Sequence, residues 1–154
     1  MRRPLAALAA LSIVLAPAAA LAASKTNESR AEAANIAAVR AFYDAALNQK
    51  DFAAAKAYLG AAYRQHNPTA KDGPEGLQAF LAFLKDKFPA SHSEIRAAYA
   101  DGDYVILHVW SVRTPGERGT AIVDIFRLDG GKIVEHWDVR QDVPETAANG
   151  NGMF

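Results

Sequence analysis

The chain has 154 residues, with 17 basic and 17 acidic side chains, 51% hydrophobic residues and no cysteine. This length and composition predict one globular domain, and the balanced charge argues against a nucleic-acid partner, because affinity for phosphates comes mainly from Lys and Arg. The absence of cysteine excludes disulfides, thiol nucleophiles and thiolate metal sites, so any chemistry must use carboxylates, imidazoles, hydroxyls and amides.

Residues 1–22 are typical of a secretory signal peptide. Arg2 and Arg3 precede a short apolar run, and Ala20 and Ala22 supply the small-residue pattern of a cleavage site. The alternative is an N-terminal membrane anchor, but the run is shorter than the ~20 apolar residues of a membrane span. We therefore expect cleavage after Ala22 and a periplasmic or secreted product with no stable membrane anchor. A flexible lead-in at 23–30 would precede a single domain at 31–154.

Three helices are predicted in the first half of this domain. The first ends near Asn48, the second follows Asp51 as its N-cap and ends at Gly60, and the third runs from Asp72 to about Pro89. Apolar spacings of three and four define the buried faces of the first and third helices. These faces comprise Ile36, Val39, Tyr43, Leu47, Leu77, Phe80, Leu81, Leu84 and Phe88. We expect a short strand or extended loop at 63–68.

Four strands are predicted from Glu94 to Arg140, at about 95–100, 104–113, 120–128 and 132–140. The segments between them are short and contain glycine in turn-forming sequences, so successive strands should pair antiparallel. Helices followed by strands indicate an α+β fold, with three N-terminal helices packed on one face of a curved antiparallel sheet.

Three chemically versatile residues share one face of the last two strands. Strand alternation places His136 and Asp138 on one face of the fourth strand, and Ile133, Glu135, Trp137 and Val139 on the other. If the turn at 129–131 has three residues, Asp124 lies directly opposite His136, with Asp138 diagonal to it. Such a cluster among apolar neighbours suits general acid–base catalysis. The alternatives are a turn of another length, which would separate the pair, or a solvent-facing pair with Trp137 inward.

His66 and Asn67 form a second candidate group. Functionally, they would project from an extended segment into a cavity and bind a substrate oxygen; structurally, His66 would bind a loop carbonyl instead. His66, His136 and Asp138 could together supply three metal ligands, but no metal-binding motif accompanies them. We therefore expect neither a metal nor another cofactor.

The chain resembles the SnoaL-like group of the nuclear transport factor two-like superfamily, which includes polyketide cyclases, ketosteroid isomerase, limonene epoxide hydrolase and scytalone dehydratase. The resemblance covers the whole domain and lies chiefly in Y-R-Q-H-N-P (63–68), D-G-P-E-G-L (72–77), A-D-G-D (100–103), V-D-I-F-R-L (123–128), G-K-I-V-E-H-W-D-V (131–139) and N-G-N-G-M-F (149–154). Taken together, these motifs resemble the subgroup of predicted SnoaL-like aldol-condensation enzymes. The oxyanion arrangement of ketosteroid isomerase is not evident, so that activity is not carried over.

The resemblance implies a cone-shaped fold, an apolar pocket between the helices and the concave sheet, and a homodimer formed through the outer sheet face. The aspartate of a similar W-x-D stretch acts on the catalytic water of the epoxide hydrolases and matches Asp138. Together with the strand alternation, this predicts Asp138, His136 and Asp124 as the catalytic group. We predict His66, Asn67, Tyr63, Phe126 and Tyr43 as the substrate-binding side chains.

These features predict an exported enzyme that uses acid–base catalysis on a small apolar carbonyl compound, through aldol-type cyclisation, isomerisation or hydration. One alternative is a non-catalytic periplasmic protein that binds a small apolar ligand in the same pocket. Another is a dimeric accessory domain whose working surface is the outer face with Glu135 and Trp137.

Overall fold

The computed structural model describes residues 16–154, and side chains from Ser29 onward. The elements in chain order are α1 (Ala16–Tyr43), a π-helical segment (Asp44–Asn48), α2 (Phe52–Lys56), β1 (Leu59–Gln65), α3 (Gly73–Lys87), β2 (His92–Asp101), β3 (Tyr104–Val112), β4 (Thr120–Asp129) and β5 (Lys132–Asp142). Most of the predicted signal peptide lies outside the described residues. No helix in the described part of the chain is both long and apolar enough to span a membrane.

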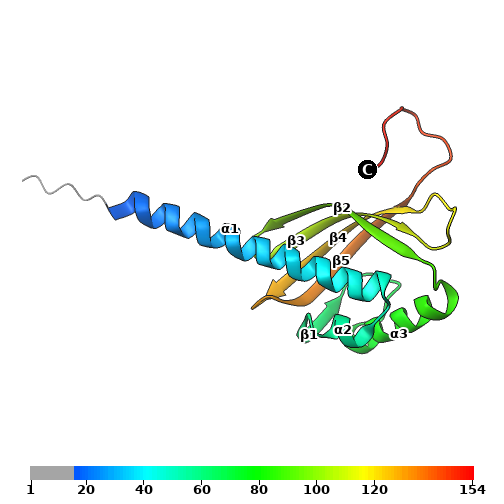
Figure 1. Ribbon diagram of the computed structural model, residues 1–154, viewed down its shortest axis with the longest axis horizontal. Helices are drawn as coiled ribbons and strands as arrows, with labels where there is room; N and C mark the ends of the chain where they lie inside the picture. Colours follow the sequence, from blue (N-terminus) through cyan, green and yellow to red (C-terminus); the bar gives the residue numbers. More distant parts are fainter. Residues whose placement is uncertain (1–15) are drawn as a thin grey trace, which may run out of the picture.

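Helix α1 is longer than the sequence pattern predicts. It begins at Ala16, so residues 23–30, expected to form a flexible lead-in, are helical. Alanine, which has the highest helix propensity, is frequent on both sides of this polar stretch and allows one helix to continue through it. The N-terminal part of α1 extends beyond the sheet, whereas its C-terminal part lies across one sheet face (Figure 1).

The turn between α1 and α2 was partly predicted. Asp51 caps α2 as expected, because its Oδ1 accepts a hydrogen bond from the backbone N–H of Ala54 at 3.0 Å. The helix is shorter than predicted, since Leu59 and Gly60 already belong to β1. This earlier strand start matters because β1 supplies cavity side chains.

The sheet has the strand order β1-β5-β4-β3-β2 (Figure 1). The pairs β2–β3, β3–β4 and β4–β5 are antiparallel, as predicted, but β1 pairs parallel to β5. The sheet is therefore mostly, not wholly, antiparallel. The parallel pair arises because the chain leaves β1 through α3 and enters the sheet again at its opposite edge, as β2.

The β4–β5 hairpin corrects the predicted register. Gly130 and Gly131, with φ of 55° and 75°, form a two-residue turn rather than a three-residue turn. A bulge follows, because Leu128 pairs with Ile133 whereas Arg127 pairs with Glu135. The turn and the bulge each shift the register by one residue, so His136 keeps its predicted face.

Two individual predictions in this hairpin were wrong. The Cα partner of Asp124 is Asp138, and His136 lies opposite Phe126. Ile133 belongs to the core and is fully buried, although simple alternation placed it on the outer face. The bulge reverses the alternation at this one position.

The core fills the space between the helices and the concave sheet face. Phe42 of α1 packs edge-on against Phe126 of β4, with 5.8 Å between ring centroids. The largest fully buried side chains are Phe42, Phe126, Leu81, Leu84, Leu107, Leu128, Ile133, Val39, Val105 and Val109. They place α1 and α3 over one sheet face and leave room between them for the cavity.

Candidate functional site

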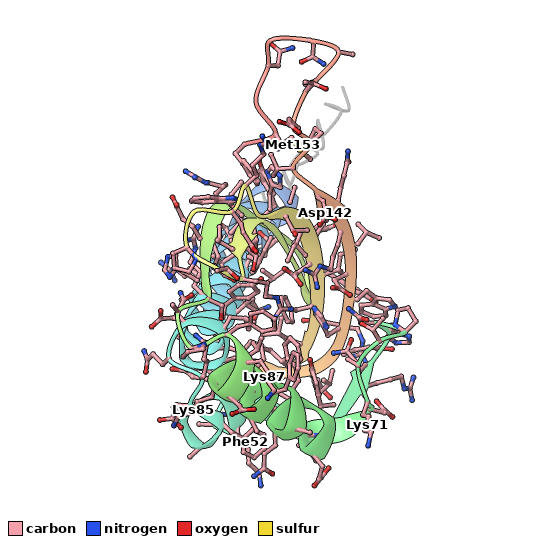
Figure 2. The ribbon with its side chains drawn as sticks, turned by 90° about the vertical axis from the view of Figure 1, so that its right-hand side faces the viewer. Phe52, Lys71, Lys85, Lys87, Asp142 and Met153 are labelled. Atoms are coloured by element: carbon pink, nitrogen blue, oxygen red, sulfur yellow. The ribbon has the colours of Figure 1, made fainter. Side chains whose placement is uncertain are left out.

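A cavity of about 460 Å³ lies between α1, α3 and the concave sheet face. Figure 2 shows side chains from α3 and from the sheet pointing into the space between these elements. The apolar lining includes Phe42, Leu47, Leu77, Phe80, Phe83, Leu84, Ile122 and Phe126, and the polar lining includes Tyr43, Tyr63, Gln65, Asn67, Asp124, His136, Asp138, Ser91, Ser93, Ser111, Lys71, Arg113 and Arg140.

Asp124 lies at the centre of the polar cluster. Its side chain is 6% exposed, and the hydroxyl of Tyr43 donates to its Oδ2 at 3.0 Å. Burial, and then the charge of Asp124, raise the pKa of Tyr43 well above its ordinary value, so this hydroxyl remains a donor. The other carboxylate oxygen, Oδ1, lies 3.0 Å from Nε2 of His136.

The hydrogen bonds around His136 determine where its proton lies. Oε1 of Gln65 accepts from the backbone N–H of Asn67, which identifies it as the amide oxygen, and lies 2.9 Å from Nδ1 of His136. Nδ1 must therefore carry a proton and donate it. The short contact between Nε2 and Asp124 then requires a second proton between those two atoms, on either the imidazole or the carboxyl group. The pair consequently has no net charge.

Gln65 connects this pair to a second tyrosine. Its Nε2 donates to the hydroxyl of Tyr63 at 3.2 Å, which leaves the Tyr63 proton available to another acceptor. Burial, and then the charge of Asp124, raise the pKa of Tyr63 above its ordinary value, so this group also stays protonated. Gln65 was not predicted as a site residue, although its place two residues after Tyr63 on β1 puts both on one face.

Asp138 differs from Asp124 because only one of its carboxylate oxygens accepts a hydrogen bond from a described residue. Its Oδ2 accepts from Nδ2 of Asn67 at 2.8 Å, whereas its Oδ1 is buried and has no hydrogen-bond partner among the described residues. Oδ1 of Asn67 accepts from the backbone N–H and the hydroxyl of Thr69, which fixes the amide with its NH₂ toward Asp138. Asp138 is thus held in one orientation with an unsatisfied buried oxygen, a feature of reactive sites.

The structure brings together seven of the eight predicted site residues at the cavity: Tyr43, Tyr63, Asn67, Asp124, Phe126, His136 and Asp138. His66, expected to project into the cavity, lies on the outer sheet face instead. Its ring stacks on Trp137 with 4.5 Å between centroids, and its Nε2 contacts Glu135 at 2.9 Å. The reason is strand alternation, because Tyr63 and Gln65 face inward and the next residue faces outward.

Two arginines at the cavity were not predicted. Arg140 lies two residues after Asp138 and so shares its face of β5, and Arg113 follows the end of β3. Burial, and then the nearby positive charge of Arg140, lower the pKa of Arg113. The signal for Arg140 was available in the alternation of β5, whereas nothing in the sequence places Arg113 beside it.

The polar cluster does not match a metal centre. Among the described residues, no three His, Asp or Glu side chains gather closely enough to hold a metal ion. His66 and His136 lie on opposite faces of the sheet, so the three-ligand set considered from the sequence is not assembled. The described side chains offer proton transfer and hydrogen bonding instead.

The sequence model of the SnoaL-like domain matches residues 39–136 of the chain. The chain belongs to this SnoaL-like family. The match includes Asp124 and His136 but ends two residues before Asp138. A search of curated proteins finds no match to the chain.

Solved structures confirm the nuclear transport factor two-like fold of this SnoaL-like protein. A candidate polyketide cyclase from Bacillus cereus superposes with a TM-score of 0.61 at 21% identity, over 70% of this chain and 74% of that one. A candidate SnoaL-like polyketide cyclase from Jannaschia sp. CCS1 gives 0.60 at 21%, over 71% and 87%. An epoxide hydrolase of the limonene epoxide hydrolase-like type from M. tuberculosis gives 0.59 at 23%, over 71% and 84%. At such low identities these likenesses establish the fold alone.

Proposed function

We propose that this SnoaL-like protein is an acid–base catalyst acting on a small, largely apolar carbonyl compound. The observation that carries the proposal is the buried, unpartnered Oδ1 of Asp138, next to the proton-sharing pair of Asp124 and His136. The apolar side chains of the cavity lining suit a largely apolar substrate. The candidate cyclases and the epoxide hydrolase among the structural relatives are consistent with a catalytic role.

In the proposed reaction, Oδ1 of Asp138 removes a proton from the carbon next to the substrate carbonyl. Negative charge then develops on the carbonyl oxygen, and the hydroxyl of Tyr63, whose proton is not used by Gln65, donates to it. The Asp124–His136 pair supplies a nearby proton for return to carbon or oxygen. Such a proton transfer is common to aldol-type cyclisation and isomerisation.

The test is hydrogen–deuterium exchange at the carbon next to the carbonyl in a panel of apolar mono- and bicyclic ketones, followed by NMR in heavy water. We expect the protein to accelerate exchange for at least one ketone and Asp138→Asn to lower that rate about a hundredfold or more, the usual contribution of a general base. Asp129→Asn, a substitution at the exposed last residue of β4, is the matched control and should leave the rate unchanged.

Full exchange activity in Asp138→Asn would show that another group is the base. If a ketone binds but the wild-type protein does not accelerate exchange, the cavity belongs to a non-catalytic binding protein, which is the alternative function. Binding can be followed independently by calorimetry, so the two outcomes are distinguishable.

We further propose that a second copy of the chain covers the outer sheet face. Val123 and Val139 are Cα partners on this face and are 37% and 68% exposed, and Tyr99 is 63% exposed. An exposed apolar group of this kind is typical of an interface. Val139→Glu should convert a dimer into a monomer in light scattering, whereas Lys85→Glu on α3 should not. A wild-type monomer would contradict this proposal.

A further inference from the structure

We propose that the ligand of this cavity is an organic acid, whose carboxylate binds Arg113 and Arg140 while its apolar part fills the space toward Asp138. The part concerning the carboxylate depends only on the cavity. The position of the reacting carbon at Asp138 rests on the proposed function.

The two guanidinium groups approach the cavity from neighbouring parts of the sheet. Arg140 is the Cα partner of Ile122. This pair lies two residues along β4 and β5 from the pair formed by Asp124 and Asp138. Arg113 is close enough to Arg140 for the positive charge of Arg140 to lower its pKa, after the larger effect of burial. Both arginines line the cavity, so they can reach one ligand group together.

Neither guanidinium forms an ion pair with a carboxylate within the described part of the chain. Arg113 instead lies over the rings of Phe80 and Phe88, each 5.5 Å from the guanidinium carbon. These aromatic contacts orient the group but leave its hydrogen-bond donors unused. Glu117 and Asp142 line the adjoining surface with these arginines but form no ion pair with either. Two neighbouring cations without a paired carboxylate repel each other, and a bound carboxylate would relieve this repulsion.

Hydroxyl groups accompany the two arginines. Ser93 and Ser111 are Cα partners, and the hydroxyl of Ser93 donates to that of Ser111 at 3.0 Å, which leaves the Ser111 proton available. The hydroxyl oxygen of Ser91 is buried and has no partner among the described residues. All three serines line the cavity. This end of the cavity therefore offers both positive charge and neutral donors, which is the donor set that a carboxylate needs.

The charges of the whole cavity favour the same conclusion. Its charged lining residues are Lys71, Arg113, Arg140, Asp124 and Asp138. The Asp124–His136 pair has no net charge, so the one remaining negative charge, that of Asp138, faces three positive charges. An anionic ligand balances this excess. Asp138 repels the anion from its own end, which directs the carboxylate to the arginines.

The spacing along β5 limits the shape of the ligand. Residues two apart on a strand are separated by about 7 Å, so the carboxylate would be several bonds from the carbon at Asp138. A ketone carrying a carboxyalkyl arm has this arrangement, whereas an acid with its carboxylate directly on the carbonyl carbon does not.

The experiment compares 2-naphthylacetate with its neutral counterpart 2-naphthylacetamide by calorimetry. These probes share their apolar part and differ in charge. We expect the acid to bind about ten times more tightly than the amide, and Arg113→Gln and Arg140→Gln each to lower acid affinity about tenfold without changing amide affinity. Arg96→Gln, on the outer face, is the control and should change neither.

Equal affinities for acid and amide, or unchanged acid affinity in both cavity variants, would overturn the proposal. Unchanged amide affinity shows that a variant is folded. If neither variant folds, the wild-type protein still decides the question, because the affinity for the acid alone should fall as salt concentration rises.

Asp138→Asn separates this inference from the proposed function. It removes the proposed base and a negative charge from the cavity, so ketone exchange should be lost while 2-naphthylacetate still binds at least as tightly. Loss of the acid preference with intact exchange would refute only the organic-acid ligand.

Discussion

The side-chain amide of Gln65 determines how His136 presents its ring to the cavity. Its oxygen accepts from Nδ1 of His136 and from the backbone N–H of Asn67, and its NH₂ group donates to Tyr63. One residue therefore orients the imidazole, one end of the loop that carries Asn67, and the proposed oxygen-binding tyrosine. A residue in this role acts through its neighbours, since it orients the groups proposed to react.

We predict that Gln65→Leu lowers the free energy of unfolding by about 1–3 kcal/mol, because it removes the acceptor of a buried imidazole N–H. Without this acceptor, Nδ1 of His136 should no longer keep its proton. The change of tautomer can be detected in the nitrogen chemical shifts of the His136 ring. Gln65→Glu is the control, because a carboxylate can still accept a hydrogen bond from Nδ1. An unchanged tautomer in Gln65→Leu would contradict the assignment.

At the scale of elements, the loop between β1 and α3 depends on close contact with the helix. Gly76 lies in the first turns of α3, and a methyl group there would overlap the backbone carbonyl of Lys71. The absence of a side chain at Gly76 thus allows the loop to cross the helix and bring Asn67 to Asp138. The contact links helix packing directly to the orientation of the proposed base.

Gly76→Ala reverses the usual effect of this substitution. Alanine normally stabilises a helix interior by about 1 kcal/mol relative to glycine, but the overlap with a backbone group should instead destabilise the protein by about 1–3 kcal/mol. Urea unfolding measures the difference. Gln78→Ala, at an exposed position of the same helix, should be neutral. A stabilising Gly76→Ala would show that the loop can move away without cost.

The elements also show what the sequence could and could not predict. His136 and Asp138 were placed correctly on one face because strand alternation is local, and Asp51 and Pro74 marked helix starts by local chemistry. Asp124 was placed on the same face although the predicted turn was wrong, because the shorter turn and the bulge compensate for each other. Which elements pair with one another was harder to predict. The contacts of Gln65 depend on the parallel pairing of β1 with β5, which joins segments about seventy residues apart and has no local signal.

At the scale of the whole molecule, Glu135 joins three strands on the outer face. Its carboxylate accepts from Arg127 of β4 at 2.8 Å, contacts His66 at the end of β1 at 2.9 Å, and lies 3.6 Å from Arg64. The hydrogen bonds with His66 and then with Arg127 lower the pKa of Glu135 below its ordinary value. This network ties the parallel edge strand to the sheet on the side opposite the cavity.

The lowered pKa gives a pH dependence of known sign. The ionised form is favoured in the native state, so its stabilisation is fully present above the unfolded-state value near ~4.3 and is lost as the pH falls through the lower native value. We expect the stability difference between wild type and Glu135→Gln to be constant at neutral pH and to shrink in this acid range. Glu145→Gln, at a side chain that is 81% exposed, should show little such change. Urea unfolding at a series of pH values measures both.

The paired glycines and the bulge at the β4–β5 hairpin have a consequence for how this chain can vary. Each shifts the residue pairing between β4 and β5 by one, and only the two shifts together keep His136 and Asp138 on the cavity face of the sheet. A single-residue insertion or deletion here would exchange the two faces of β5 and present Trp137 to the cavity. Related chains with the same chemistry can therefore vary this hairpin in steps of two residues, or must gain or lose a bulge together with a turn residue.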